Sequence, residues 1–314
     1  MRKRVLVCLL VLTLVLPLVA AGQTAAVASE GNGTFEGIGH GFGGEVKVAV
    51  TLKDGKITDI SVTEHKESKG VSDCAISEMP KRIVDAQSYE VDVLSGATYS
   101  ANAIKMAVKK ALTSANIAGF DTKQEIEKTE EEITADVVVV GAGLAGLSAA
   151  IEAKKAGSDV VILEKEGRIG GNSILSGGIV YATGSPMNKD VDNDVDALVS
   201  YYQERAHGKA DETLLKYMAS HSGETIAWMI EQGVVFNEKL GVGGTSPALR
   251  AHSSPIRGAG IVVPIYEKAK ELGVKFCMER PVTKLLVEDG KLMGVISEGK
   301  YGKLTVKAKA VVMA

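Results

Sequence analysis

Cysteine is scarce in this chain, which has three cysteines among its 314 residues. Cys8 lies in an N-terminal apolar run, and Cys74 and Cys277 lie in different predicted domains, which argues against a structural disulfide. The sequence contains no Cys-x-x-Cys-His motif and no group of four cysteines. These absences exclude an attached c-type haem and an iron–sulfur cluster, so any redox chemistry needs a different cofactor.

A strong excess of charge is also missing, because the formal net charge is −3 and the only basic cluster is Arg2-Lys3-Arg4. Nucleic acid is therefore not an expected partner. Asp190, Asp192 and Asp194 alternate, but they lack the glycine and the distal glutamate of a calcium loop. We predict no metal site and interpret these aspartates as a solvated loop or a helix start.

The N-terminus predicts a secretory signal peptide over residues 1–28. A basic cluster precedes an apolar run from Val5 to Ala20, and Ala26-Val27-Ala28 supplies small residues for cleavage after Ala28. The protein is then exported to the periplasm, the exterior or the cell surface. An uncleaved membrane anchor is the alternative, since the run is slightly short for a membrane span.

The stretch from Ala135 to Gly178 predicts a βαβ unit. A buried strand at Val137–Val140 runs into Gly141-Ala142-Gly143-Leu144-Ala145-Gly146, which opens a helix that ends near Gly157. A second buried strand, Val160–Leu163, leads to an acidic residue, Glu164. Glycines at this spacing between two strands, with a terminal acid, indicate a dinucleotide site.

Each residue of this motif has an expected task. Gly141 permits the tight turn, Gly143 lets the backbone approach a pyrophosphate, and Gly146 lets helix and strand pack closely. The amides of the helix start, where Ala145 lies, would hold phosphates. Glu164 would accept the ribose hydroxyls.

The residues after Glu164 carry a family resemblance. Glu164-Lys165-Glu166, Gly170-Gly171-Asn172-Ser173 and Ser176-Gly177-Gly178 resemble the flavoprotein subunit of the fumarate reductase and soluble flavocytochrome c family, to which urocanate reductases are similar. The resemblance implies a bacterial protein with noncovalent FAD, and it makes NAD the weaker alternative. The further cofactor-binding residues that it implies are Lys165, Gly171, Asn172, Ser173, Gly177, Gly178, Ala259, Gly260 and Val282.

Residues 31–115 predict a small α+β domain. An alternating strand at Glu45–Leu52, an Asp54-Gly55 turn and a strand at Ile57–Val62 indicate an antiparallel sheet. Helices are expected over Ser72–Ala86 and Ala101–Ala111.

Between those helices lies Asp92-Val93-Leu94-Ser95-Gly96-Ala97-Thr98. Its polar residues could simply cap the following helix. The segment also resembles the FMN-binding domain of Rnf and Nqr electron-transfer subunits. There a flavinyl transferase joins the FMN phosphate to the last threonine through a phosphoester. The resemblance implies covalent FMN on Thr98, with Asp92, Ser95, Gly96 and Ala97 completing the motif.

Residues 116–134 predict a solvated, partly helical linker, because Asp121–Thr134 is charged, free of glycine and has an acidic excess. A binding tail is the alternative. Residues 135–314 predict an α/β, Rossmann-like FAD-binding domain. Its later helices are expected over Val195–Ala206, Asp211–Ser220, Gly223–Gln232 and Ile261–Leu272, and its later strands over Val274–Cys277, Val282–Val287, Leu292–Ser297, Leu304–Ala308 and Val311–Ala314. Near Arg250-Ala251-His252, the resemblance favours a flavin-lining role for His252 over a catalytic one.

Relatives in this family continue beyond the last strand into a cap domain that holds the substrate-binding arginines and histidines. The resemblance therefore implies a C-terminally truncated chain, with an incomplete FAD domain, unknown catalytic residues and no turnover by itself.

The function implied is that of an exported, membrane-associated oxidoreductase of anaerobic respiration. An external or membrane donor would reduce FMN, which passes electrons to FAD for reduction of the C=C bond of a small α,β-unsaturated carboxylate such as fumarate or urocanate. The alternative is an FMN-based electron-transfer module that serves a protein partner without turning over a substrate. A 3-ketosteroid-type dehydrogenase is a third interpretation.

Overall fold

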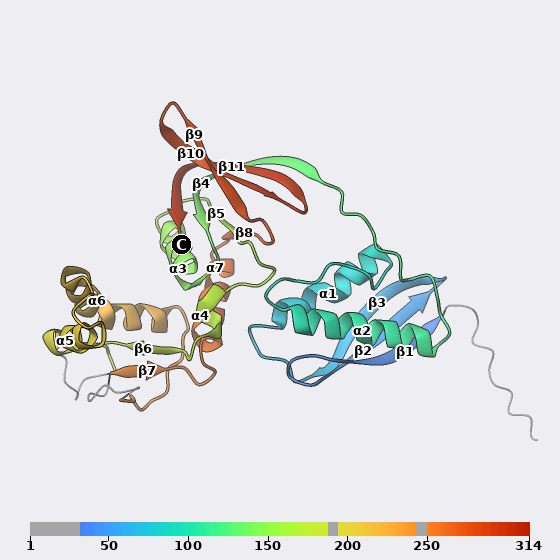
Figure 1. Cartoon of the computed structure of the whole chain (residues 1–314), viewed down its shortest axis with the longest axis horizontal. Helices are drawn as coiled ribbons and strands as arrows, with labels where there is room; N and C mark the ends of the chain where they lie inside the picture. Colours follow the sequence, from blue (N-terminus) through green and yellow to red (C-terminus); the bar gives the residue numbers. More distant parts are fainter. Residues whose placement is uncertain (1–31, 188–193, 243–249) are drawn as a thin grey trace, which may run out of the picture.

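The computed structural model describes residues 32–187, 194–242 and 250–314. The predicted signal peptide, together with Asp190 and Asp192, lies outside the described residues. Two domains are visible in Figure 1: an N-terminal domain that contains the elements β1 to α2, and a C-terminal domain that contains β4 to β11. No helix in the described ranges is both long enough and apolar enough to span a bilayer.

The N-terminal domain is α+β, with a three-stranded antiparallel sheet in the order β1-β2-β3 and two helices. The alternation predicted in the second strand is confirmed, because Val46, Val48, Val50 and Leu52 are buried in the core between the sheet and the helices. The elements are β1 (Gly33–His40), β2 (Glu45–Lys53), β3 (Lys56–His65), α1 (Asp73–Ala86) and α2 (Thr98–Ser114).

Strand β1 was not among the expected strands, because its glycines resemble a loop. These glycines let α2 pack directly on the sheet: a Cβ at Gly37 would lie 2.0 Å from the Ala107 carbonyl oxygen, and one at Gly39 would lie 1.9 Å from that of Ala103. Close packing of α2 therefore requires the glycines of β1. Sequence patterns alone associate such glycines with turns.

The C-terminal domain is α/β, with a six-stranded mixed sheet in the order β8-β5-β4-β11-β10-β9. The strands β8, β5, β4 and β11 run parallel, and β10 and β9 add an antiparallel edge. The helices α3 and α7 pack in one apolar core with β4 and β5. The elements of this layer are β4 (Thr129–Val140), α3 (Leu144–Lys155), β5 (Val160–Leu163), α7 (Ala259–Glu271), β8 (Lys275–Cys277), β9 (Val282–Glu288), β10 (Lys291–Gly299) and β11 (Gly302–Met313).

The predicted helical character of the linker is wrong: residues 117–128 form no helix, and residues 129–134 form the first half of β4. This half pairs in parallel with β11, from Gly302 opposite Thr129 onward, and Lys307 forms a 2.8 Å ion pair with Glu132. The two strands predicted at 304–308 and 311–314 are likewise one strand, β11. A partner more than 170 residues away fixes this structure, so the local charge pattern could not predict it.

The rest of the C-terminal domain lies between β5 and α7. A single helix, α6, replaces the two helices predicted on either side of residues 221–222, and it contains Gly223. Asp194 caps α5, since its carboxylate accepts from the amides of Asp196 and Ala197, which agrees with a helix start. The elements are α4 (Gly171–Leu175), β6 (Ile179–Tyr181), α5 (Val195–Arg205), α6 (Glu212–Glu231) and β7 (Ala251–Ser253).

The two domains are packed together. Val71, from the segment between β3 and α1, packs against the apolar core of the C-terminal domain. Arg82 of α1 donates to the carboxylate of Glu279, which also accepts from Lys300 at 2.7 Å and from the Tyr301 hydroxyl at 2.9 Å. An apolar contact and a polar cluster therefore hold the N-terminal domain beside α4 and α7 (Figure 1).

Candidate functional site

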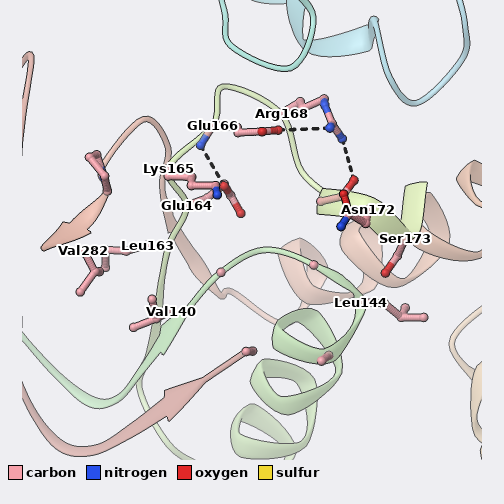
Figure 2. A pocket seen from close by; sticks show the side chains of 16 residues that line it. Val140, Leu144, Leu163, Glu164, Lys165, Glu166, Arg168, Asn172, Ser173 and Val282 are labelled. Atoms are coloured by element: carbon pink, nitrogen blue, oxygen red, sulfur yellow. Dashed lines mark hydrogen bonds and ion pairs between the residues drawn. The ribbon is translucent and has the colours of Figure 1, made fainter. Parts of the chain in front are cut away.

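A cavity of about 550 Å³ lies where the parallel strands β4 and β5 end. Its walls come from the turn into α3, the loop after β5, α4 and the start of β9. Figure 2 shows Val140 and Leu163 at the strand ends, with Glu164 and Lys165 following β5. Open α/β sheets bind ligands at the carboxyl ends of their strands, so this cavity is placed to bind one.

Nine of the residues predicted to bind FAD line this cavity. They are Gly141, Gly143, Ala145, Glu164, Lys165, Gly171, Asn172, Ser173 and Val282.

The glycines of the turn into α3 have distinct structural roles. Gly141 has φ +105°, a conformation that residues with a side chain rarely adopt. A Cβ at Gly146 would lie 2.0 Å from the Gly141 carbonyl oxygen, so α3 packs on the turn only with glycine there. A Cβ at Gly143 would meet nothing within 4 Å, because it would project into the cavity.

Glu164 is buried and holds the loops around the cavity. One carboxylate oxygen accepts from the Ala142 amide at 2.8 Å, and the other accepts from the Glu166 amide at 2.8 Å. An ionised carboxylate has about four acceptor positions, so each oxygen can accept a further hydrogen bond. Glu164 can therefore fix the protein backbone and still bind a ligand hydroxyl.

Arg168 lines the same cavity and joins it to the N-terminal domain. Its Nε donates to the Gly96 carbonyl at 3.0 Å, and one Nη donates to the Gly171 carbonyl at 3.0 Å. The other Nη forms a 3.2 Å ion pair with Glu166 (Figure 2). With 6% of its surface exposed, Arg168 is held in place by backbone groups from both domains.

A second cavity, of about 210 Å³, lies at the N-terminus of α2. Thr98 is the first residue of α2, its side chain is exposed, and the N-cap residue Ala97 provides no side-chain hydrogen bond. The buried Glu67 lines this cavity, and its carboxylate accepts from the Gly43 amide at 2.6 Å and from the Ser100 hydroxyl. Thr98 therefore presents its hydroxyl beside uncapped amides and next to an open cavity.

The other residues of the predicted FMN motif divide between two surroundings. Gly96 and Ala97 line the Thr98 cavity, whereas Ser95 faces the C-terminal domain and accepts from the Gly167 amide at 3.1 Å through its carbonyl and 3.2 Å through its hydroxyl. Asp92 lies outside the Thr98 cavity and forms a 3.2 Å ion pair with Lys123.

Five of the residues predicted to bind FAD do not line the larger cavity. Gly146 is buried in the helix–strand contact, and Ala259 and Gly260 begin α7 in the core. Gly178 approaches the backbone of Arg257, and Gly177 lies beside it in the loop before β6. Their contact with a cofactor stays a prediction.

His252 also lies away from the larger cavity, fully buried beside Ser185. One ring nitrogen lies 2.7 Å from the Ser185 hydroxyl, the other lies 3.0 Å from the Arg250 carbonyl, and burial lowers the pKa of the ring. Burial raises the pKa of the Cys74 thiol to about 11 and also raises that of Cys277, so neither thiol is a ready nucleophile. Within the ranges that the structure describes, no cluster of three His, Cys, Asp or Glu side chains could hold a metal ion.

Two residues that line these cavities, Arg168 and Leu175, were not singled out from the sequence. Arg168 lies in a loop, and its partner Gly96 is far away in the sequence. Leu175 ends the five-residue helix α4 and looks like an ordinary core leucine in the sequence, yet 59% of its surface is exposed. No local pattern marks either residue.

Two family comparisons match the sequence. The family described as FAD binding domain matches residues 136–314, and the family described as FMN-binding domain matches residues 41–113. The first match contains the larger cavity, and the second contains Thr98.

Curated relatives carry the names of reductases. The chain is 29% identical to a urocanate reductase of Eggerthella lenta over 94% of this chain and 51% of the relative. It is 27% identical to an NADH:acrylate oxidoreductase of Vibrio harveyi over 84% of this chain and 33% of the relative. An acrylate reductase flavoprotein subunit of Shewanella woodyi is 33% identical over 68% of this chain and 44% of the relative. The chain thus spans about half, or less, of the length of these relatives.

Solved structures share the fold of the C-terminal domain. The open conformation of a flavocytochrome c3 fumarate reductase matches with a TM-score of 0.54 at 30% identity, covering 57% of this chain and 33% of that chain. A 3-ketosteroid-Δ4-(5α)-dehydrogenase from Rhodococcus jostii RHA1 matches with a TM-score of 0.53 at 27% identity, and the match covers 60% of this chain and 48% of that chain.

Proposed function

Because the chain belongs to the FAD binding domain family, we propose that it works as an exported flavin-dependent reductase of α,β-unsaturated carboxylates. Electrons would enter at an FMN joined to Thr98 and would continue to a noncovalent FAD in the larger cavity. A flavinyl transferase would attach the FMN, and an external or membrane donor would reduce it. The names of the urocanate, acrylate and fumarate reductases among the relatives support the substrate class.

The observation that carries this proposal is the direct connection between the two cavities. The Ser95-Gly96 loop belongs to the predicted FMN motif, and its carbonyls accept hydrogen bonds from the Gly167 amide and from Arg168, which lines the larger cavity. Two flavins held at these sites would be neighbours within one packed structure. A relay between them then needs no large domain movement.

The residues of the larger cavity fit FAD. The first-turn amides of α3 have no side-chain cap, which leaves them free to donate to a pyrophosphate. The absent Cβ of Gly143 leaves space for a phosphate to approach those amides. Glu164 has acceptor positions left for the two ribose hydroxyls.

The residues of the smaller cavity fit an FMN phosphate on Thr98. The N-terminus of the 17-residue helix α2 supplies uncapped amides and the positive end of the helix dipole, both of which stabilise a phosphodiester anion. Glu67 and Ser100 bind each other, so the Thr98 hydroxyl stays available for the ester bond. When bound, FMN would supply one-electron exchange, and FAD would supply the hydride for an addition across the C=C bond that a proton completes.

The test of FMN attachment uses the 314-residue chain coexpressed with a flavinyl transferase. A denaturing gel should show a flavin-fluorescent band that Thr98→Ala loses and that Thr113→Ala, at the other end of the same helix, keeps. A known acceptor protein verifies that the transferase is active. A dark wild-type band beside a bright acceptor band, or a band that persists in Thr98→Ala, would overturn the covalent site.

The substrate class is tested with the natural protein that contains this chain, loaded with both flavins. The flavins are reduced chemically without oxygen, and fumarate, urocanate or acrylate is added. We expect at least one of them to reoxidise the flavins. Reoxidation by a protein partner alone would instead support the electron-transfer module.

A further inference from the structure

Three large apolar side chains are exposed around Thr98. Phe42 is 76% exposed, Tyr99 is 71% exposed and Leu175 is 59% exposed, and all three line the same cavity. The rings of Phe42 and Tyr99 meet edge to face, with their centroids 6.3 Å apart. Exposed apolar groups that gather at one cavity indicate a site for an apolar surface from elsewhere.

Leu175 differs from the other two because the C-terminal domain supplies it. It is the last residue of α4, whose first residues, Gly171, Asn172 and Ser173, line the larger cavity. Five residues of helix therefore extend from one cavity to the other. Four steps of about 1.5 Å place the two ends of α4 about 6 Å apart along its axis.

Packing holds α4 against the N-terminal domain. A Cβ at Gly70 would lie 2.9 Å from the Cβ of Ala259 and 3.3 Å from the Cδ1 of Ile174, the residue before Leu175. Val71, which lines the Thr98 cavity, also packs into the core of the C-terminal domain. The packing of Gly70 and Val71 against the C-terminal domain thus fixes the position of Leu175 beside Thr98.

We propose that Leu175 forms one wall of the binding site for the FMN ring. The C-terminal domain then completes the FMN site, and α4 separates the two flavins. This inference rests on the proposed attachment of FMN to Thr98. The isoalloxazine would be the apolar surface that covers Phe42, Tyr99 and Leu175. The cavity of about 210 Å³ is smaller than the pockets that usually enclose a ligand, so it would cover only part of the ring.

The experiment measures how easily iodide quenches the fluorescence of the FMN in the flavinylated 314-residue chain. The FAD signal is subtracted by means of Thr98→Ala, which lacks only the covalent flavin. Leu175→Ala should raise the quenching constant by roughly twofold, because the lost apolar contact opens the ring to water. Leu175→Met keeps size and apolarity and should restore the wild-type value.

Leu214→Ala is the matched control, since Leu214 is an exposed leucine, 66% exposed, on α6 outside both cavities. Its quenching constant should equal that of the wild type. An unchanged constant in Leu175→Ala, with the fluorescent gel band intact, would overturn the role of Leu175 and leave the FMN attachment standing. A wild-type chain without the gel band would overturn the attachment and this inference together.

Discussion

Gly143 and Gly146 allow a test that separates ligand binding from folding. Both are glycines of the turn into α3, yet alanine meets different surroundings at each position. At Gly143 the added methyl group enters the larger cavity, whereas at Gly146 it lies 2.0 Å from the Gly141 carbonyl oxygen. We therefore expect Gly143→Ala to impair FAD binding and Gly146→Ala to impair folding.

The magnitudes follow from the local geometry. Gly143 has φ −71° and ψ 176°, which alanine adopts without strain, so the free energy of unfolding of the flavin-free chain should change by less than about 1 kcal/mol. The methyl group would keep a phosphate away from the amides of α3. A lost charge-assisted hydrogen bond costs about 2 kcal/mol, which weakens FAD binding roughly 30-fold.

Gly146→Ala should instead lower the free energy of unfolding by about 1–3 kcal/mol, because the turn or the helix must move to admit the methyl group. In a domain of this size each kcal/mol lowers the melting temperature by about 2–4 °C. The assays are thermal unfolding of the flavin-free chain and FAD titration followed by flavin fluorescence. Wild-type FAD affinity in Gly143→Ala, or equal destabilisation by the two substitutions, would refute this interpretation of the turn.

Two further predictions concern the contact between the domains. Burial opposes ionisation of Glu279, but hydrogen bonds from Arg82 and Lys300 outweigh it and hold the pKa of that carboxyl below its usual range. Glu279→Gln should therefore cost about 3 kcal/mol in thermal unfolding at pH 7. Because the folded-state pKa is lowered, the difference from wild type should shrink as the pH falls below about 4, and a constant difference would contradict the ion pair. In Arg168→Lys, the lysine cannot donate to two carbonyls in a fixed fork, so the contact between the domains should open more easily. Hydrogen exchange at the Gly167 amide should then accelerate about tenfold for each 1.4 kcal/mol lost from the free energy of local opening. An unchanged exchange rate would contradict the positioning role of Arg168.

The βαβ unit could be predicted from sequence because its signals are local. Strand β5 has the predicted bounds Val160–Leu163, α3 begins at Leu144 within the glycine motif, and Glu164 follows β5 at the cavity. Apolar period, glycine spacing and a terminal acid all lie within one stretch of about 30 residues. Local patterns of this kind also revealed β2, β3 and the two helices of the N-terminal domain.

Helix α6 shows why the remaining elements were harder to predict. Gly223 is a poor helix former by propensity, and the two predicted helices are divided just before it. In the structure, a Cβ at Gly223 would lie 2.5 Å from the Gly184 carbonyl group, so glycine is needed for the chain to cross the helix closely. Gly223 is therefore a packing residue inside one continuous helix, and its partner Gly184 is distant in the sequence.

The same limit applies to the contact between the two cavities, and there it bears on function. The FMN motif and the glycine motif are each legible from local spacing, but neither indicates that Gly96 faces Arg168 or that Leu175 faces Thr98. Each of these contacts joins residues more than 70 positions apart, from loops or from the end of a five-residue helix. A sequence that encodes two flavin motifs is consistent with two independent carriers. The packing of α4 between the cavities is the observation that favours a single relay, and it ties the Leu175 experiment to the function of the whole chain.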